Sequence, residues 1–368
     1  MAENTSLVAE DPQETKVLTA RCFCKAVQFT LTVPAALLPL RVHMCHCNVC
    51  RYMRGTPCVW HAPLPKGIEP RFVEPLNKED MLTEYRHGAA VRLFCKTCGC
   101  HIGNVDADAD IEGKKGWRVS SSIFDAHSED NFRMWAHECT DSSPGGGMYR
   151  WVPTMAGREL AIHNPRPKEP DSDNRSRGSE PLVGGKVDER LRGECHCGGV
   201  NFSISRPSAR LFEDERLKKT VSPLDKTKWQ AILDLCDDCR LVSGAHAVAW
   251  VFIPVSCISP AVPADLEFGT LTVFESSKGI LRAFCGVCGA TVFYEHTEKN
   301  RKRSERVIDV ATGILRTSDG AVGKDWFTWR TDRIAFQESG DRFDPVFSQA
   351  LKEGFKAWGE KEYGKSEG

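Results

Sequence analysis

The chain has 368 residues, of which 41% are hydrophobic and 27% are charged, and its formal net charge is −1. This near-zero charge excludes a global positive field that would draw the protein onto nucleic acid or an anionic membrane, so general nucleic-acid binding is not expected. The chain has no apolar stretch of about 18 residues, which excludes a membrane-spanning helix. The basic run 299–303 is interpreted as a solvated loop.

Residues 1–17 are predicted to be a disordered N-terminus, without the basic and apolar regions of a signal peptide. Seventeen cysteines in a chain without such a signal are typical of metal binding or catalysis in a reducing compartment. We therefore expect a cytoplasmic protein, with the nucleus as the open alternative. Oligomeric state has no signal in the sequence.

Period-two alternation predicts short strands at residues 27–33, 200–204 and 271–274, and short helical pieces are expected after the central cysteine motifs. These patterns favour a mainly β fold, and the cysteine motifs described below indicate two tandem zinc domains. The expected organisation is a first domain at 18–160, a linker at 161–188, a second domain at 189–340, and a C-terminal helix and tail at 341–368. Apolar residues at helical spacing between Phe347 and Trp358 indicate that this helix packs on the second domain.

Three pairs of cysteine motifs recur in the same order in both halves of the chain, and their flanking residues also agree. This order indicates two diverged copies of one domain. The matching motifs are Cys22-Phe23-Cys24 with Cys195-His196-Cys197, Cys47-Asn48-Val49-Cys50 with Cys236-Asp237-Asp238-Cys239, and Cys95-Lys96-Thr97-Cys98-Gly99 with Cys285-Gly286-Val287-Cys288-Gly289.

In each copy the first and last motifs are predicted to meet and form a structural zinc site. Two cysteine pairs brought together supply four thiolates, which suits tetrahedral zinc. The first site is assigned to Cys22, Cys24, Cys95 and Cys98, and the second to Cys195, Cys197, Cys285 and Cys288. Four reduced, metal-free cysteines are the competing interpretation of each set.

The first copy has a further motif in which Cys45, Cys47 and Cys50 can hold one metal ion from one face. Three protein ligands leave the fourth tetrahedral position open, as in catalytic zinc sites. Three thiolates make the zinc site net negative, which favours binding and exchange of a soft thiol. His46 and Arg51 are candidate catalytic residues that relay a proton or hold an anionic group. A simple packing role for His46 stays open.

In the second copy Asp234 and Leu235 replace Cys45 and His46, whereas Cys236 and Cys239 remain. Asp234 can complete a second open zinc site through its carboxylate, or the site can be empty or used for another purpose. Zinc is therefore expected at two structural sites and at one or two open sites.

Four cysteines lie outside these motifs and are expected to be small buried hydrophobic residues. Cys100 is also considered as an alternative zinc ligand because it follows Cys98 closely. The four are Cys58, Cys100, Cys139 and Cys257.

At these motifs the chain resembles the glutathione-dependent formaldehyde-activating enzyme family, which includes centromere-protein-V-like proteins. The resemblance covers about residues 18–150 and 189–335. It implies a β-tent zinc fold with a structural four-cysteine zinc and a three-cysteine zinc that engages substrate. It also implies formation of a carbon–sulfur bond between formaldehyde and glutathione, the reverse of a lyase reaction.

Several family positions differ between the two copies. The terminal aspartate of the family pattern is kept as Asp125, whereas Arg316 stands at the matching place in the second copy. A family histidine corresponds to His137 and has no evident partner in the second copy.

Three functions are compatible with these observations. The first is a zinc-dependent carbon–sulfur lyase or synthase acting on a thiol adduct of a small carbonyl compound, such as a glutathione adduct. The second is another zinc enzyme on the same scaffold, with a larger substrate between the domains. The third is a non-catalytic module that binds proteins through a zinc fold.

Overall fold

The computed structural model of the chain describes residues 14–73, 78–110, 112–125, 127–165, 190–301 and 305–364. It is mainly β, as the sequence predicts, with several sheets and few helices. The first 13 residues and residues 166–189, which include most of the predicted linker, lie outside the described residues. None of the described helices has the length and apolarity required to cross a bilayer.

The first domain contains a three-stranded antiparallel sheet, ordered β1-β2-β5, and an eight-stranded sheet, ordered β13-β10-β3-β4-β9-β8-β7-β6. A small hairpin, β11-β12, completes it. Its elements are β1 (Thr15–Arg21), β2 (Gln28–Pro34), η1 (Ala35–Leu37), β3 (Leu40–Cys45), α1 (Asn48–Arg54), β4 (Val59–Pro63), β5 (Arg71–Phe72), α2 (Lys78–Met81), β6 (Leu82–His87), β7 (Ala90–Cys95), β8 (His101–Asp106), β9 (Trp117–Ser120), η2 (Ser121–Ile123), β10 (Phe132–Glu138), η3 (Thr140–Ser142), α3 (Met148–Trp151), β11 (Thr154–Met155), β12 (Arg158–Glu159) and β13 (Ala161–His163).

The second domain has a three-stranded sheet, ordered β14-β15-β18, and a seven-stranded sheet, ordered β19-β20-β21-β22-β17-β16-β23. The last two helices, α6 and α7, follow it. The elements are β14 (Arg190–Glu194), β15 (Asn201–Ser205), η4 (Ala209–Phe212), η5 (Leu217–Thr220), β16 (Trp229–Asp234), α4 (Asp237–Ser243), β17 (Val248–Pro254), η6 (Val255–Cys257), β18 (Ile258–Ser259), β19 (Leu271–Ser277), β20 (Ile280–Cys285), β21 (Thr291–His296), α5 (Thr297–Arg301), β22 (Val307–Ala311), η7 (Thr312–Ile314), β23 (Phe327–Trp329), α6 (Gln337–Phe343) and α7 (Pro345–Tyr363).

The two large sheets have the same strand order. Without the edge strand β13, the order β10-β3-β4-β9-β8-β7-β6 corresponds strand by strand to β23-β16-β17-β22-β21-β20-β19. The strand that precedes the central cysteine motif has the same kind of neighbour in both domains, since β10 pairs in parallel with β3 and β23 pairs in parallel with β16. This shared topology agrees with the repeat inferred from the cysteines.

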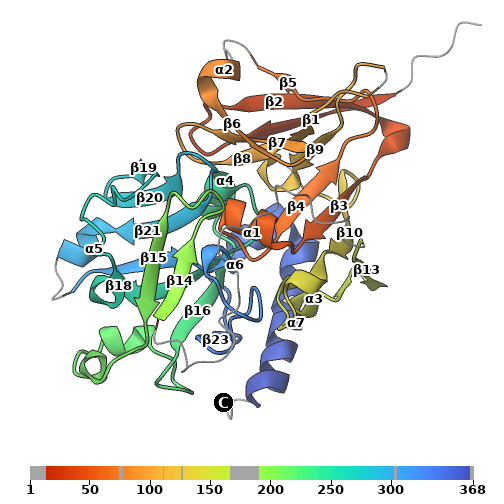
Figure 1. Ribbon diagram of the computed structural model, residues 1–368. Coiled ribbons are helices and arrows are strands. Elements are labelled where there is room, and N and C mark those ends of the chain that lie inside the picture. The colour runs from red at the N-terminus through yellow and green to blue at the C-terminus, as the bar shows by residue number, and fades with distance from the viewer. Residues whose placement is uncertain are drawn as a thin grey trace, which may run out of the picture.

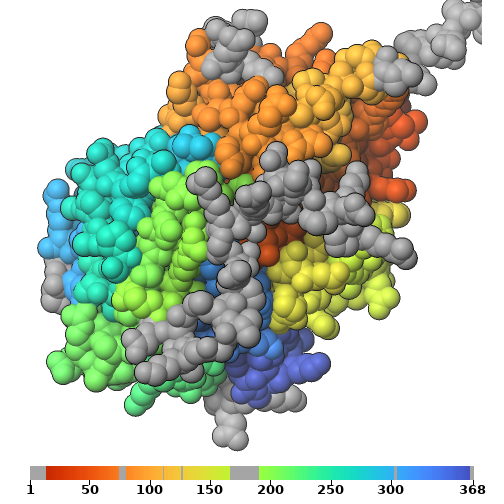
Figure 2. All heavy atoms as spheres, in the orientation of Figure 1, coloured from red at the N-terminus to blue at the C-terminus, as the bar shows by residue number. Residues whose placement is uncertain are grey.

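The two domains contact each other through equivalent surfaces (Figures 1 and 2). The backbone N–H of Phe23 donates to Leu241 O at 3.2 Å, and that of His196 donates to Tyr52 O at 3.1 Å. Phe23 and His196 occupy the same position in the two C-x-C motifs, and Tyr52 and Leu241 the same position in α1 and α4. The interface is therefore reciprocal, as in a two-fold symmetric dimer.

Two glycines allow this close approach. Gly55 ends α1 with φ of 75° and Gly244 ends α4 with φ of 70°, a left-handed conformation that glycine adopts without steric penalty. A Cβ atom on Gly55 would lie 2.0 Å from Thr291 O, and one on Gly244 would lie 2.3 Å from His101 O. The helix that follows each central cysteine motif is thus held against the opposite domain.

The C-terminal helix α7 packs on both domains, rather than on the second domain alone (Figure 1). The ring of Phe355 lies 5.0 Å from Trp151 of the first domain and 6.0 Å from Trp329 of the second, measured between centroids. The carboxylate of Asp344 accepts a hydrogen bond from Phe347 N at 3.0 Å and caps the helix. This helix therefore joins the two halves through one apolar face.

Two expected boundaries and one expected loop differ from the structure. Strand β1 begins at Thr15, inside the predicted disordered N-terminus. Ala161–His163, placed in the linker, form strand β13 because they pair in parallel with β10 at the edge of the large sheet. Thr297–Arg301 form helix α5, so the described part of the predicted basic loop is helical.

Candidate active site and metal centres

The first four-cysteine set comes together as the sequence predicts. The Sγ atom of Cys24 lies 3.5 Å from the Sγ atom of Cys22 and 3.6 Å from that of Cys95. Tetrahedral zinc with Zn–S bonds of about 2.3 Å requires sulfurs about 3.8 Å apart, close to these distances. Val27 N–H also donates to Cys22 Sγ at 3.3 Å, which favours a thiolate. The donor set therefore fits structural zinc.

The second set repeats this geometry in the other domain and includes Cys288. The Sγ atom of Cys197 lies 3.5 Å from those of both Cys195 and Cys285. Val200 N–H donates to Cys195 Sγ at 3.3 Å, as Val27 does in the first domain. The hydrogen bond from Cys195 lowers the pKa of Cys197 to about 7, so the ligand form is accessible near neutral pH.

Cys45, Cys47 and Cys50 form a separate group of three thiols. Cys45 is at the end of β3, and Cys47 caps α1 by accepting a hydrogen bond from Cys50 N at 3.3 Å. Cys45 is buried, whereas Cys47 and Cys50 are half-buried. The hydrogen bond from Cys45 holds the pKa of Cys47 well below its usual range. The group can hold a metal ion with three sulfurs and keep one side open.

Beside these thiols, a chain of hydrogen bonds fixes the tautomers of two buried histidines. Nε2 of His137 lies 2.9 Å from Val152 O and must therefore carry a proton that it donates. His137 Nδ1 then accepts from His46 Nε2 at 3.1 Å. His46 Nδ1 is left as a lone pair without a hydrogen-bond partner among the described residues. Burial keeps the pKa of His46 well below its usual range, so this ring is a neutral base.

Arg51 is fully buried next to the same group. Its Nη2 donates to Asn48 Oδ1 at 3.1 Å, but its Nε and Nη1 have no hydrogen-bond partner in the described part of the chain. Arg316 of the second domain crosses the interface, with its guanidinium carbon 3.3 Å from the centroid of the Tyr52 ring. The unpaired donors of Arg51 suit an anionic group such as a carboxylate, because hydrogen bonds between a guanidinium and an anion are charge-assisted.

A comparison with known protein families finds a match over the part of the chain that contains these groups. Residues 17–141 match the family model of the glutathione-dependent formaldehyde-activating enzyme. The matched segment contains the first four-cysteine set, the three-cysteine group, His46, Arg51 and His137, and it does not extend into the second domain. A search of curated proteins finds no match to the chain.

Two residues of the matched segment were not predicted as part of the site. His61 Nε2 lies 3.7 Å from Cys50 Sγ. Cys139 is not the buried hydrophobic residue that was expected, because it is half-buried and its hydrogen bond to Cys45 raises the pKa of Cys45. Cys139 follows β10, the strand that pairs with β3. The spacing of the cysteine motifs does not predict this pairing, so it does not predict that Cys139 lies near Cys45.

The other isolated cysteines are buried, as expected: Cys58, Cys100 and Cys257. Cys100 Sγ donates to His101 O at 3.8 Å and does not belong to the four-thiol group of the first domain.

The second domain differs at the position of the three-cysteine group. Asp234 Oδ1 accepts from Cys236 N at 2.7 Å, and its Oδ2 accepts from Trp250 Nε1 at 3.2 Å and from the Cys239 thiol at 3.5 Å. Arg282 Nη1 lies 3.3 Å from Cys239 Sγ. The second domain's own side chains therefore satisfy this carboxylate and this thiol. The described residues of the second domain contain no equivalent of the His46–His137 pair, because Leu235 replaces His46.

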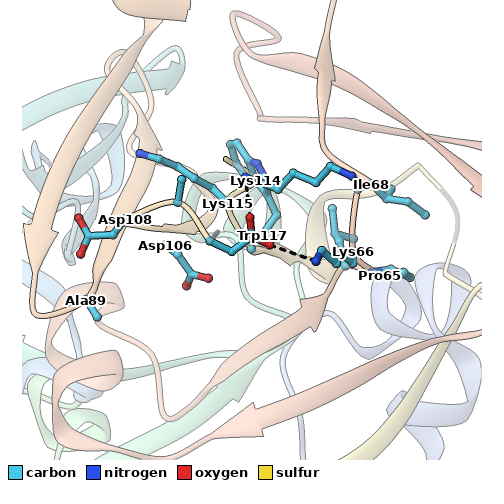
Figure 3. A pocket seen from close by; sticks show the side chains of 14 residues that line it. Pro65, Lys66, Ile68, Ala89, Asp106, Asp108, Lys114, Lys115 and Trp117 are labelled. Atoms are coloured by element: carbon cyan, nitrogen blue, oxygen red, sulfur yellow. Dashed lines mark hydrogen bonds and ion pairs between the residues drawn. The ribbon is translucent and has the colours of Figure 1, made fainter. Parts of the chain in front are cut away.

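A surface hollow of about 490 Å³ lies elsewhere on the first domain (Figure 3). It is lined by lysine and aspartate side chains, and Lys66 forms an ion pair with Asp110 at 3.3 Å across it. No cysteine lines it, so it is separate from the candidate site at the three-cysteine group.

Proposed function

We propose that this protein is a zinc-dependent carbon–sulfur lyase or synthase whose reaction takes place in the first domain. It joins a thiol to a small aldehyde such as formaldehyde. A carbon–sulfur bond forms, the thiol loses its proton, and the carbonyl oxygen gains a proton to give an S-hydroxymethyl thioether. The observation that carries this proposal is the group of Cys45, Cys47 and Cys50 beside a histidine with an unpaired lone pair.

Each group of the site has a separate role in the proposed reaction. Zinc bound to the three thiolates would supply Lewis acidity and a site for the thiol sulfur. His46 Nδ1 accepts the thiol proton. In the series of hydrogen bonds from His46 through His137 to Val152, it is the ring nitrogen without a hydrogen-bond partner among the described residues. Protonated His46 then returns this proton to the carbonyl oxygen. Arg51 holds a carboxylate of the thiol substrate.

We further propose that Asp234, Cys236 and Cys239 bind no zinc, so that the second domain has no counterpart of the open three-cysteine site. Asp234, Cys236 and Cys239 already hydrogen-bond to one another, and Arg282 supplies the positive charge that a metal ion would otherwise bring. The domain that keeps the histidine pair thus carries out the chemistry, and the second domain contributes Arg316 at its edge.

The direct test is NMR exchange spectroscopy with glutathione and formaldehyde. The protein with its zinc is expected to accelerate exchange between free thiol and S-hydroxymethyl adduct above the uncatalysed rate. An unchanged exchange rate with fully zinc-loaded protein, over several thiols and small aldehydes, would contradict the proposal.

Replacing Arg51 by methionine is expected to raise KM for glutathione about 10- to 100-fold with a smaller change in kcat. A hydrogen bond to a charged partner contributes about 1.5–3 kcal/mol, which corresponds to this range. The thermal unfolding temperature should stay the same or rise, because the variant removes a buried, incompletely paired charge. Steady-state kinetics and calorimetry measure both effects.

A thiol without carboxylates, 2-mercaptoethanol, serves as the control substrate. Wild type and the Arg51→Met variant should turn it over with similar KM values. An equal loss with both thiols would show that Arg51 does not recognise a carboxylate.

A further inference from the structure

A further group of potential metal ligands contains no cysteine. It consists of His127, His246 and Asp344, and all three are buried, with 2%, 1% and 7% of their side-chain surface exposed. His127 precedes β10 in the first domain, His246 follows α4 in the second, and Asp344 begins α7. The group therefore joins the three parts of the molecule at one point.

The three side chains converge on one carboxylate oxygen. Asp344 Oδ2 lies 2.8 Å from His127 Nδ1 and 3.6 Å from His246 Nε2. Tetrahedral zinc bound to nitrogen and oxygen at about 2.0–2.1 Å requires donor atoms about 3.3–3.4 Å apart, which lies between these two distances. Two imidazoles and a carboxylate are ligands that zinc commonly takes.

The alignment of these contacts is poor for hydrogen bonds. Neither nitrogen of His127, nor His246 Nε2, nor Asp344 Oδ2 has a well-aligned hydrogen-bond partner in the described parts of the chain. An unsatisfied buried polar atom costs about 1–3 kcal/mol. A cation between the three donors removes this cost, whereas a single shared proton satisfies one pair.

The surroundings hold the rings in place as in known metal sites. His246 Nδ1 lies 2.7 Å from Ser122 Oγ, which can fix the tautomer that turns the Nε2 lone pair toward Asp344. Phe132 stacks on His127 at 5.1 Å and Trp60 stacks on His246 at 5.3 Å, between ring centroids. The other oxygen of Asp344 accepts the α7 cap. The apolar walls and low exposure leave little room for substrate.

We propose that His127 Nδ1, His246 Nε2 and Asp344 Oδ2 bind one structural zinc ion that fastens the two domains and α7 together. This site is independent of the cysteine clusters and of the proposed reaction. His246 has no counterpart in the first domain, since Pro57 occupies the position that matches it. The site therefore belongs to the two-domain arrangement rather than to a single domain.

The test uses the full chain purified without added metal and compares zinc per chain between variants. Asp344→Asn keeps the helix cap, because asparagine is an equally good N-cap, but removes the anionic ligand. We expect this variant and His246→Gln each to lose one zinc per chain. His101→Gln, at a buried histidine outside the group, and Asp234→Asn, in the second domain's altered site, should lose none.

Anomalous diffraction from wild-type crystals at the zinc edge covers the case in which the variants do not fold. A peak between the three donor atoms supports the proposal. Unchanged zinc in folded Asp344→Asn and His246→Gln, or peaks at the cysteine clusters without one here, would overturn it in favour of a proton-sharing network.

Discussion

Replacing Cys47 by alanine is expected to lower turnover of thiol and aldehyde by about a thousandfold or more. The metal ion would lose one of its three protein ligands, and its contribution to the barrier is several kcal/mol, at about 1.4 kcal/mol for each tenfold in rate. The fold should survive, because the lost α1 cap costs only about 1 kcal/mol. Exchange kinetics, zinc content and thermal unfolding report on the three effects.

Two further variants make this test specific. Cys47→Ser keeps a capping oxygen but replaces the soft sulfur ligand, so it should also lose turnover. Cys236→Ala changes the matching residue of the second domain and should leave turnover close to wild type. Full activity of Cys47→Ala, or equal loss in Cys236→Ala, would place the reaction elsewhere.

The four-cysteine sets could be predicted from the sequence because a metal ion imposes a strict local pattern. Each pair is two or three residues apart, which brings two sulfurs onto one side of a turn. The same order in both halves then indicates which pairs meet. Both sets occur in the structure, together with the three-cysteine group and the mainly β fold.

The histidine pair and the buried His127 group could not be predicted in this way. His46 and His137 are 91 residues apart and meet because β10 lies beside β3 in parallel. His246 and Asp344 come from different elements of the second half, and His127 comes from the first. Contacts between residues so far apart in the sequence depend on how sheets and helices pack, and the spacing of motifs does not predict this packing.

A comparison of equivalent strand positions in the two domains shows which residues of the second domain replace the histidines of the first. Trp250 occupies the place of His61, since both lie on the strand opposite the residues that precede the central motif. Ile334 occupies the place of His137, because Leu235 N–H donates to Ala335 O as His46 N–H donates to Glu138 O. Each histidine of the first site is thus replaced by a side chain that does not titrate.

The arginine that replaces the family aspartate has a physical explanation as well. In the first domain Arg21 pairs with Asp125 at 3.0 Å, and in the second Glu194 pairs with Arg316 at 3.3 Å. The two charges have exchanged places, so the ion pair is kept. The exchange also brings a guanidinium group to the edge of the first domain's site. Two diverged copies can therefore complete a single site together.

Replacing Cys195 by serine is expected to remove one zinc per chain and to destabilise the second domain strongly. Structural zinc sites contribute about 10–16 kcal/mol of binding free energy, which is coupled to folding. If the variant loses about 4 kcal/mol of this, its unfolding temperature falls by roughly 8–16 °C, since 1 kcal/mol shifts a domain of this size by about 2–4 °C. Calorimetry and elemental analysis measure both quantities.

The matched control is Cys257→Ser, which alters a buried cysteine of the same domain outside the metal-binding sets. It should keep all its zinc and lose only about 1–3 kcal/mol, the cost of a buried hydroxyl. Equal destabilisation of both variants without loss of zinc would show that the four thiols are packed in the core without metal. Loss of zinc in Cys195→Ser alone would establish that the metal holds β14, β15 and the β20–β21 turn together, because these elements carry or flank its four ligands.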